Sequence, residues 1–519
     1  MQTHSKIIQL ESWAIYGDWP CPMLPCRHLL PVSLALMLLA CRGGADEAPP
    51  LQVDAVGDGA ARTIVADALN AGLTSRDSAG LVVPGLAQSW RVSDDGLSIV
   101  FRLRQAQFAG GADVTAADVV ASLERARKGG AGAMARDLLA GVTAVSAPLD
   151  SVIELQLSTP QPELLELLAT PPLAIRARRS RETAGAYLVS LPPKEAAPAS
   201  GTALRANPRY FAAERVTLEA ATVHGFDAEA ALQRFNRGET DLVLGGGLDG
   251  LGSARATAPR GTLQLEQPRA ALLLLLNQKE GPLADLRVRR ALALAIDRAA
   301  LGEAFFGTRS AGEVRALSPT NIAGYAPPEP GWVAQPFVGR QEEARRLLTE
   351  AGFDPVSSRL KLAVSIHYSP GEARLIELVA RDLAQVGVDL TLERRDADAQ
   401  RRAISAGDFQ LALIRRQTPV DSPLPFLWPN LCRRNSHGVC LPEADKLYAE
   451  SWVAPTRGAR LKALADAERL WAENGAAIGL VQPIGWSLVS PRVSGFTPNP
   501  GGIHSLRHLS IDLTRRLLK

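Results

Sequence analysis

Three glycines after an apolar strand have the spacing that most resembles a chemical motif. Gly245, Gly247 and Gly250 form G-x-G-x-x-G, and Glu266 lies roughly where a dinucleotide site places its ribose-binding acid. Such a motif holds a pyrophosphate only when a helix opens at the last glycine. The following residues show little apolar periodicity and soon reach Pro259. We therefore interpret these glycines as a flexible loop.

Other residue types also fail to form a catalytic or metal-binding pattern. The chain has no P-loop, no H-E-x-x-H and no G-x-S-x-G. His504 and His508 are four residues apart, but the alternation around them is typical of a strand, which would separate their side chains. No pair of carboxylates stands out for acid–base work. The sequence therefore predicts a protein that is not an enzyme and that has no cofactor or metal.

The elements that would position a binding site alternate between strand and helix. Residues 361–414 predict β-α-β-α-β, with helices at Glu372–Gln385 and Asp396–Ala406, and hence a parallel sheet with right-handed crossovers. Ala228–Asn236 and Thr240–Leu244 predict another helix and strand. This alternation predicts two α/β lobes. Ligands of such folds bind at the C-terminal ends of strands or between lobes.

Several further elements can be placed from local patterns. Residues 97–103 alternate as a half-buried strand entered through the Asp95-Gly96 turn, and Thr115 with Asp118 predicts a helix cap. Leu272–Leu276 reads as a strand buried on both faces. From Asp285 we expect one helix with four arginines away from its apolar face, which comprises Val288, Leu292, Ala295, Ile296 and Ala299.

Composition excludes several classes of protein. The 519 residues are 46% hydrophobic and 21% charged, which is unlike a disordered, collagen-like or coiled-coil chain. At roughly 100–200 residues per domain, two to four domains are expected. The sequence has no apolar run of about 18 residues, which excludes a polytopic membrane protein. A net charge of +3 does not suggest binding to nucleic acid.

The N-terminal residues predict export. After Met23, Arg27 precedes the apolar stretch Leu29–Leu39, and Leu38-Leu39-Ala40-Cys41 resembles a bacterial lipobox. Cys41 would then be the lipidated first residue of the mature protein, with residues 41–50 as a tether. The alternatives are an ordinary signal peptide or a hydrophobic N-terminal helix of a cytosolic protein. We also expect Met23 to be the true start, with residues 1–22 an extension.

Two cysteines remain for the folded body. Since export implies an oxidising compartment, we predict that Cys432 and Cys440 form a disulfide that closes a short loop. Two free thiols or a metal pair are the alternatives. His437 lies between the cysteines, but the spacing is not that of a zinc site.

Several blocks, in this order, resemble a known family. They are PGLAQSWRVSDDG and the helix after it, a degraded turn TAGAYLV, NPRYF, FNRGETDLVLG, DLRVRRALALAIDRAAL and the C-terminal VSGFTPNPGG. Together they cover roughly residues 51–505 and resemble the family 5 extracellular solute-binding proteins, the dipeptide, oligopeptide and nickel receptors of ABC importers.

The resemblance implies a two-lobed periplasmic-binding-protein fold, type II-like, which closes as a Venus flytrap. It implies α/β lobes joined by a two-stranded hinge, with an extra inserted domain. We expect residues 1–40 to be the extension and signal peptide, and 41–50 the tether. Lobe I would comprise residues 51–75, 186–270 and 480–519, the inserted domain II residues 76–185, and lobe III residues 271–479.

The resemblance also implies candidate ligand-binding residues in the stretch RRQTPVDSPLPFLW. Peptide receptors of this family hold the ligand's α-amino group with an Asp there, which makes Asp421 the candidate, although the expected Trp and second Asp are absent. Arg415 would take a ligand carboxylate. Trp428 and Trp332 would line the pocket. Ion pairs between lobes and core packing are the structural alternatives for these residues.

The resemblance therefore predicts a lipid-anchored, extracytoplasmic and monomeric binding protein that delivers peptide-like ligands to ABC permease subunits. We place it in the cell envelope, facing the periplasm or the exterior. Two alternatives stay open: a family member that binds a non-peptide solute, and an envelope lipoprotein that has lost transport coupling. The ligand's identity and the choice of inner or outer membrane are also open.

Overall fold

The computed structural model describes residues 49–190, 201–307, 312–512 and 514. The predicted signal peptide, Cys41 and most of the tether lie outside these residues. The part from Pro49 onward forms one compact unit. Within the described ranges, no helix has both the length and the apolar character needed to cross a membrane.

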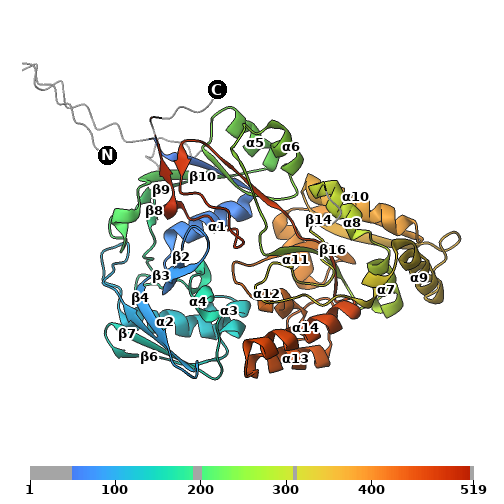
Figure 1. Cartoon of the computed structure of the whole chain (residues 1–519), viewed down its shortest axis with the longest axis horizontal. Coiled ribbons are helices and arrows are strands. Elements are labelled where there is room, and N and C mark those ends of the chain that lie inside the picture. The colour runs from blue at the N-terminus through green and yellow to red at the C-terminus, as the bar shows by residue number, and fades with distance from the viewer. Residues whose placement is uncertain (1–48, 191–200, 308–311, 513, 515–519) are drawn as a thin grey trace, which may run out of the picture. The chain divides into compact units, whose positions relative to one another are not determined.

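A seven-stranded sheet forms the part that we call lobe I. Its order is β12-β18-β11-β1-β10-β9-β8, and β1 lies between two parallel neighbours, β10 and β11. The C-terminal ends of these three strands therefore meet at one edge. The helices α1, α5 and α6 each begin shortly after one of them (Figure 1). The bounds are β1 Leu51–Val56, α1 Asp58–Leu69, β8 Tyr187–Val189, β9 Gly201–Ala206, β10 Ala220–Phe226, α5 Ala228–Asn236, β11 Leu242–Gly246, α6 Leu251–Thr257, β12 Leu263–Glu266 and β18 Gly485–Val489.

A five-stranded sheet forms lobe III, in the order β15-β14-β16-β13-β17. The predicted β-α-β-α-β run is confirmed, since β14 pairs in parallel with both β15 and β16. Every residue of β13 is buried, as expected of a strand covered on both faces. The bounds are β13 Ala270–Leu276, α9 Phe337–Glu350, β14 Leu360–His367, α10 Pro370–Ala384, β15 Val388–Arg395, α11 Ala397–Ala406, β16 Leu411–Gln417, α12 Leu424–Leu427, α13 Pro442–Val453, α14 Arg457–Glu473 and β17 Ala477–Val481.

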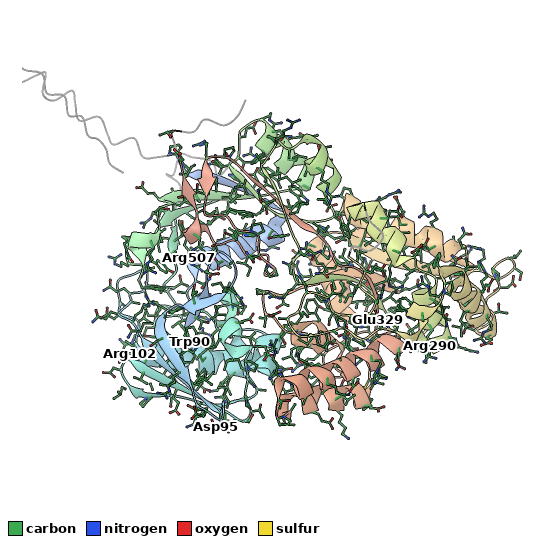
Figure 2. All side chains as sticks on the ribbon, in the orientation of Figure 1. Trp90, Asp95, Arg102, Arg290, Glu329 and Arg507 are labelled. Atoms are coloured by element: carbon green, nitrogen blue, oxygen red, sulfur yellow. A yellow bond between two sulfur atoms is a disulfide. The ribbon has the colours of Figure 1, made fainter. Side chains whose placement is uncertain are left out.

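A third, four-stranded sheet lies in the segment between β1 and β8, and we call its elements domain II. Its order is β4-β5-β7-β6, and α2 packs against β6 and β7 (Figure 1). The predicted helix cap is confirmed, because Thr115 and Asp118 form a capping box. Figure 2 shows Asp95 at the turn between β4 and β5, where its carboxylate accepts from the Leu97 N–H at 2.9 Å. The bounds are β4 Ala87–Val92, β5 Ser98–Leu103, α2 Ala116–Arg125, α3 Ala133–Leu138, β6 Val142–Leu149, β7 Val152–Leu157 and α4 Leu164–Leu167.

Two short crossovers connect lobe I with lobe III. Residues 267–269 lead from β12 to β13, and residues 482–484 lead back from β17 to β18. The two crossovers contact each other, since the side-chain amide of Gln482 donates to the Pro268 carbonyl at 3.2 Å. This is the two-lobed architecture that the resemblance implied.

The prediction of one helix from Asp285 was wrong in two respects: the helix is shorter than expected, and not all of its arginines face solvent. It ends at Leu294, and Asp297 caps a second helix, α8 (Arg298–Phe306), after α7 (Leu286–Leu294). Two of its four arginines are buried rather than turned to solvent, and Arg298 is only 3% exposed. The Arg298 guanidinium donates to the Gly479 carbonyl at 2.8 Å. A periodic pattern does not reveal such a buried guanidinium, because one of its carbonyl partners, Gly479, lies 181 residues away in sequence.

Candidate functional site

A cavity of about 930 Å³ lies between lobe I and lobe III. Its walls are the C-terminal ends of β1, β10 and β11 on one side and those of β14 and β15 on the other, with the helices that start there. Ligands of α/β folds bind at such strand ends, and the volume is in the range of small-molecule sites. We therefore take this cavity as the candidate ligand-binding site, and the side chains that line it determine which ligands it can bind.

The glycine-rich segment after β11 forms part of the lobe I wall. Our interpretation of it as a flexible loop was wrong in one respect, because a helix, α6, does open directly after Gly250. Gly247 lies against lobe III, where a side chain added to it would meet Arg415 Nη1 at 3.2 Å. The carbonyl of Asp249 accepts from the buried Trp486 indole at 2.9 Å, which fixes the segment on β18.

Arg415 is the one ligand candidate from the sequence that lines this cavity. It lies on β16 opposite Leu272 of β13. Its side chain has accessible surface because it borders the cavity, yet burial by surrounding protein lowers the pKa of its guanidinium, against the attraction of Glu372 and Glu266. Among the described residues, the guanidinium group of Arg415 has no hydrogen-bond or ion-pair partner. Its role as a carboxylate-binding residue stays a prediction.

Two carboxylates that the sequence reasoning missed face the same cavity from opposite lobes. Glu372, in the first turn of α10, accepts from the His367 N–H at 3.2 Å. Asp249 of lobe I accepts from the Gly371 N–H at the start of α10. Burial and then the charge of Asp249 raise the pKa of Glu372 to about 7, although Arg415 and the His367 hydrogen bond oppose the rise.

The cavity has an excess of negative charge. Seven carboxylates and three guanidinium groups line it, whereas the whole chain has a net charge of +3. Some of these carboxylates serve the fold: Asp227 and Asp396 cap α5 and α11, and Asp398 pairs with Arg401. Tyr368, next to Glu372 on the lobe III side, also lines the cavity and is 61% exposed. No residue pattern in the sequence brought these groups together, since they come from separate parts of the chain between Asp58 and Arg415.

Asp421 and Trp428 lie elsewhere, at the contact between lobe III and domain II. The Asp421 carboxylate accepts from Arg269 Nε at 2.9 Å and from the Ala323 N–H at 3.0 Å. The Trp428 indole donates to Asp137 of domain II at 2.9 Å. Neither residue lines the 930 Å³ cavity. Trp332 lies under two arginines, with Arg298 4.5 Å from its ring centroid.

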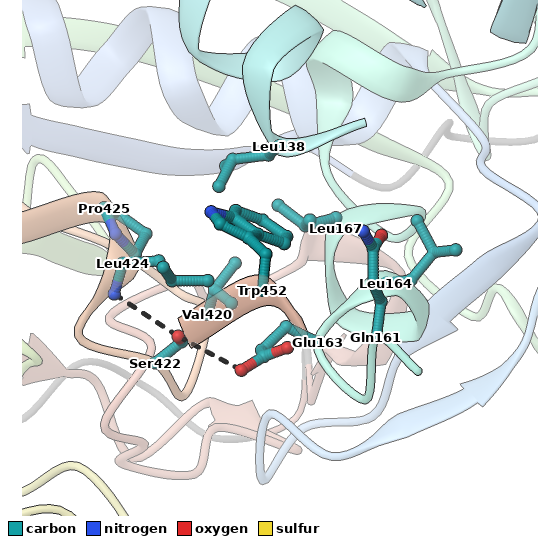
Figure 3. Close-up of a pocket in the computed structure, with 10 residues that line it drawn as sticks. All are labelled: Leu138, Gln161, Glu163, Leu164, Leu167, Val420, Ser422, Leu424, Pro425 and Trp452. Carbon is teal, nitrogen blue, oxygen red and sulfur yellow. Dashed lines mark hydrogen bonds between the residues drawn. The ribbon is translucent and has the colours of Figure 1, made fainter. Parts of the chain in front are cut away.

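The contact between domain II and lobe III includes ion pairs between acids of domain II and bases of lobe III. Arg434 donates from Nε and Nη2 to the two carboxylate oxygens of Asp137 at 2.7 and 2.6 Å, and Glu163 pairs with Arg460 at 3.0 Å. Burial alone would raise the pKa of Asp137, but the hydrogen bonds from Trp428 and Arg434 hold it below the usual value. Figure 3 shows Ser422 reaching Glu163 beside a pocket of only about 10 Å³. At this point the two parts of the chain are closely packed.

The disulfide is confirmed, since Cys432 and Cys440 are bonded. Between them His437 is 4% exposed, and burial lowers its pKa to about 4. In the described part of the chain, no three His, Cys, Asp or Glu side chains gather as a metal ion would require.

Comparisons with known proteins agree with this architecture. The sequence profile described as bacterial extracellular solute-binding proteins, family 5, middle, matches residues 82–438. "Probable di/tripeptide-binding protein 5" of Pseudomonas aeruginosa is 27% identical over 473 residues, which cover 83% of this chain and 88% of that protein.

Two solved structures are similar over nearly their whole length. Haemophilus influenzae OppA in complex with RPPGFSPFR has a TM-score of 0.81 at 22% identity, with coverage of 90% of this chain and 99% of that one. The Escherichia coli murein tripeptide-binding protein MppA has a TM-score of 0.79 at 23% identity, with coverage of 89% and 99%.

Proposed function

This chain belongs to the family 5 bacterial extracellular solute-binding proteins, and we propose that it binds a peptide-like solute between its lobes and delivers it to an ABC importer. The observation that carries the proposal is the interlobe cavity with Arg415 on its wall, whose guanidinium has no partner among the described residues. A guanidinium with no protein partner suits a ligand carboxylate, which it can bind through two parallel hydrogen bonds. The relatives named above bind peptides, which favours that ligand class.

The two crossovers give the delivery step a physical basis. With 267–269 and 482–484 as the connections between the lobes, the lobes can rotate toward each other around the solute. A solute that contacts both lobes stabilises the closed arrangement by its extra contacts there. The permease then meets a surface that exists only after binding. We propose that the protein acts as a monomer in this cycle.

The experiment begins with the purified native protein. Native mass spectra, followed by identification of what is released on unfolding, should show short peptides. Isothermal titration with a released peptide should then give a Kd at least about 10-fold weaker for Arg415→Gln, because a charge-assisted hydrogen-bond pair is lost. Arg394→Gln is the matched control, since Arg394 is an exposed arginine on β15 outside the cavity lining.

The outcomes separate the alternatives. A single non-peptide compound would keep the family and replace the ligand class. A protein that releases nothing and whose melting temperature does not respond to peptide pools would favour an envelope protein without transport coupling. Equal affinities of the Arg415→Gln variant and the native protein would remove Arg415 from the site.

We also propose that the protein is anchored in the cell envelope through lipid on Cys41. The support is the sequence alone, in which a charged segment and an eleven-residue apolar stretch precede Leu38-Leu39-Ala40-Cys41. Mass spectrometry of the native N-terminal peptide should find Cys41 as an acylated first residue. Cys41→Ala should move the protein from the membrane fraction to the soluble fraction. An unmodified peptide that spans residues 40 and 41 would refute the anchor.

A further inference from the structure

Two carboxylates from opposite lobes, Asp249 and Glu372, face the interlobe cavity, and neither forms an ion pair with a basic side chain that the structure describes. We propose that Asp249 and Glu372 form an ammonium-binding subsite that is assembled when the lobes meet, so that the preferred ligand presents a protonated amine there. This inference rests on the proposed function, because it assigns a ligand group to a place in the same cavity. It also moves amine recognition away from Asp421, whose carboxylate is already held by Arg269 and the Ala323 N–H.

The geometry leaves acceptor capacity unused at this point. Asp249 uses Oδ1 for the Gly371 N–H, and Glu372 uses Oε2 for the His367 N–H. Across the described residues, no donor is bonded to Asp249 Oδ2 or Glu372 Oε1. Both side chains line the cavity and are half-buried. An ammonium group has three donors, which can satisfy two carboxylates and one further acceptor.

The surrounding charges do not relieve the repulsion between these two groups. Arg415 on β16 attracts Glu372, but in the described part of the chain no ion pair within 4.0 Å joins the two side chains. The other groups at this wall are already engaged or distant from the pair: Asp396 caps α11, Asp398 binds Arg401, and Arg62 and Asp58 lie on α1 across the cavity, with His367 and Tyr368 beside Glu372 on lobe III. Burial and the charge of Asp249 therefore hold the pKa of Glu372 at about 7. A ligand cation between the carboxylates would lower that pKa again.

A metal ion fits this pair less well than an amine does. The described residues contain no group of three or more side chains that could hold a metal, whereas a monocation with three N–H donors matches two carboxylates. The exposed ring of Tyr368 adds an aromatic surface for a cation or a ligand side chain. With Arg415 on the same wall, the cavity offers one place for a carboxylate and one for an amine.

The test compares tri-alanine with N-acetyl-tri-alanine in isothermal titrations at pH 7. The native protein should bind tri-alanine at least about 10-fold more tightly, since acetylation removes a charge-assisted contact. Glu372→Gln should reduce that ratio to less than about 3-fold. Glu377→Gln is the control and should keep the full ratio, because Glu377 is an exposed acid on the same helix, outside the cavity lining.

Proton release gives a second measurement. At pH 7 about half of the Glu372 side chains are protonated, so binding of an ammonium group should release roughly half a proton per tri-alanine. Titrations in buffers of different ionisation enthalpy measure this number, and it should fall to near zero in Glu372→Gln. Glutamine keeps the shape of glutamate, and an unchanged near-ultraviolet circular dichroism spectrum would exclude misfolding.

Each outcome bears on one proposal. If the native protein binds both peptides equally, or if Glu372→Gln keeps the 10-fold preference and the proton release, the ammonium subsite is wrong while the transport function stands. If the native protein binds neither peptide, the peptide ligand of the proposed function fails, and this inference fails with it.

Discussion

At the scale of single residues, the ionisation of Glu372 should be visible in the stability of the ligand-free protein. Its pKa is about 7 in the folded protein against an ordinary value of 4.5. Between these pH values the folded state binds more protons than the unfolded state. The stability that protonated Glu372 contributes is therefore fully present below pH 4.5 and is lost as the pH rises through 7.

We therefore expect Glu372→Gln to be as stable as the native protein at pH 4 and more stable by about 1–3 kcal/mol at pH 8.5. Urea unfolding at the two pH values measures this difference. Glu377→Gln, an exposed glutamate on the same helix, should leave the pH dependence unchanged. A native-like loss of stability with pH in Glu372→Gln would contradict the assignment.

A second residue-scale prediction concerns Glu468 on α14, which is completely buried. One of its oxygens accepts from the N–H groups of Leu317 and Ser318, both at 2.8 Å, and the other accepts from the hydroxyls of Ser318 and Tyr325. Glu468→Leu leaves two buried N–H groups without acceptors.

We expect this leucine variant to lose about 3 kcal/mol of unfolding free energy, measured in urea. Glu468→Gln should lose less than about 1.5 kcal/mol, because its carbonyl can still accept from both N–H groups. Equal losses in the two variants would show that the hydrogen bonds to Leu317 and Ser318 do not carry the effect.

The candidate site was only partly predictable from single residues. Arg415 was found through the family resemblance, because some peptide-binding members place an arginine at this position, six residues before Asp421. Asp421 was chosen for its place in a motif, and the sequence does not reveal that Arg269, 152 residues earlier, holds its carboxylate. Glu372 was placed at a helix start, but its charge became informative only once Asp249 lay beside it.

At the scale of elements, the start of α10 depends on a glycine. A Cβ at Gly371 would meet Asp249 N, Asp249 Oδ1 and the carbonyl carbon of Leu248, each at 2.8 Å, and all three atoms belong to lobe I. Gly371→Ala therefore pushes the lobes apart here without removing any charge. We expect a Kd for peptide at least about 10-fold weaker, measured by isothermal titration.

The control is Gly339→Ala on α9, where nothing lies within 4 Å of the added methyl group. That variant should bind like the native protein and be slightly more stable, since alanine favours a helix over glycine. Small-angle X-ray scattering adds a direct check: the decrease in radius of gyration on peptide binding should be smaller in Gly371→Ala. An undiminished decrease would mean that the lobes approach without this contact.

Elements with strong periodicity were predictable, and their interruptions were not. Residues 361–414 gave the observed strands and helices because each apolar period is complete within its own element. The helix from Asp285 was divided because Asp297 caps a new helix. That cap competes with a continuous apolar stripe, and periodicity alone does not decide between them.

At the scale of the whole molecule, lobe III touches lobe I at α10 and domain II at Asp137. These contacts share no residue. We expect Asp137→Asn, which weakens the Arg434 pair, and Gly371→Ala to weaken peptide binding independently. The change in binding free energy of the double variant should equal the sum of the single changes within about 0.5 kcal/mol. A larger deviation in the titrations would show that the two contacts act as a unit.

The architecture was accessible from the sequence as a set of ordered blocks, but the relation between lobes was not. Many contacts that join the lobes and domain II connect residues far apart in sequence: Asp249 and Gly371 are 122 positions apart, and Arg460 and Pro160 are 300 positions apart. No local pattern encodes such pairs. The division of the chain into lobe I, domain II and lobe III at the predicted boundaries stays a prediction.

The paired crossovers also limit how well a transporter can distinguish one bound solute from another. The Gln482–Pro268 hydrogen bond holds the two linkers side by side, so we expect the lobes to close by rotation through one common angle. Any solute that permits the same angle produces the same outer face. A permease that docks on that face would therefore detect that the lobes are closed, but it would not distinguish one enclosed solute from another.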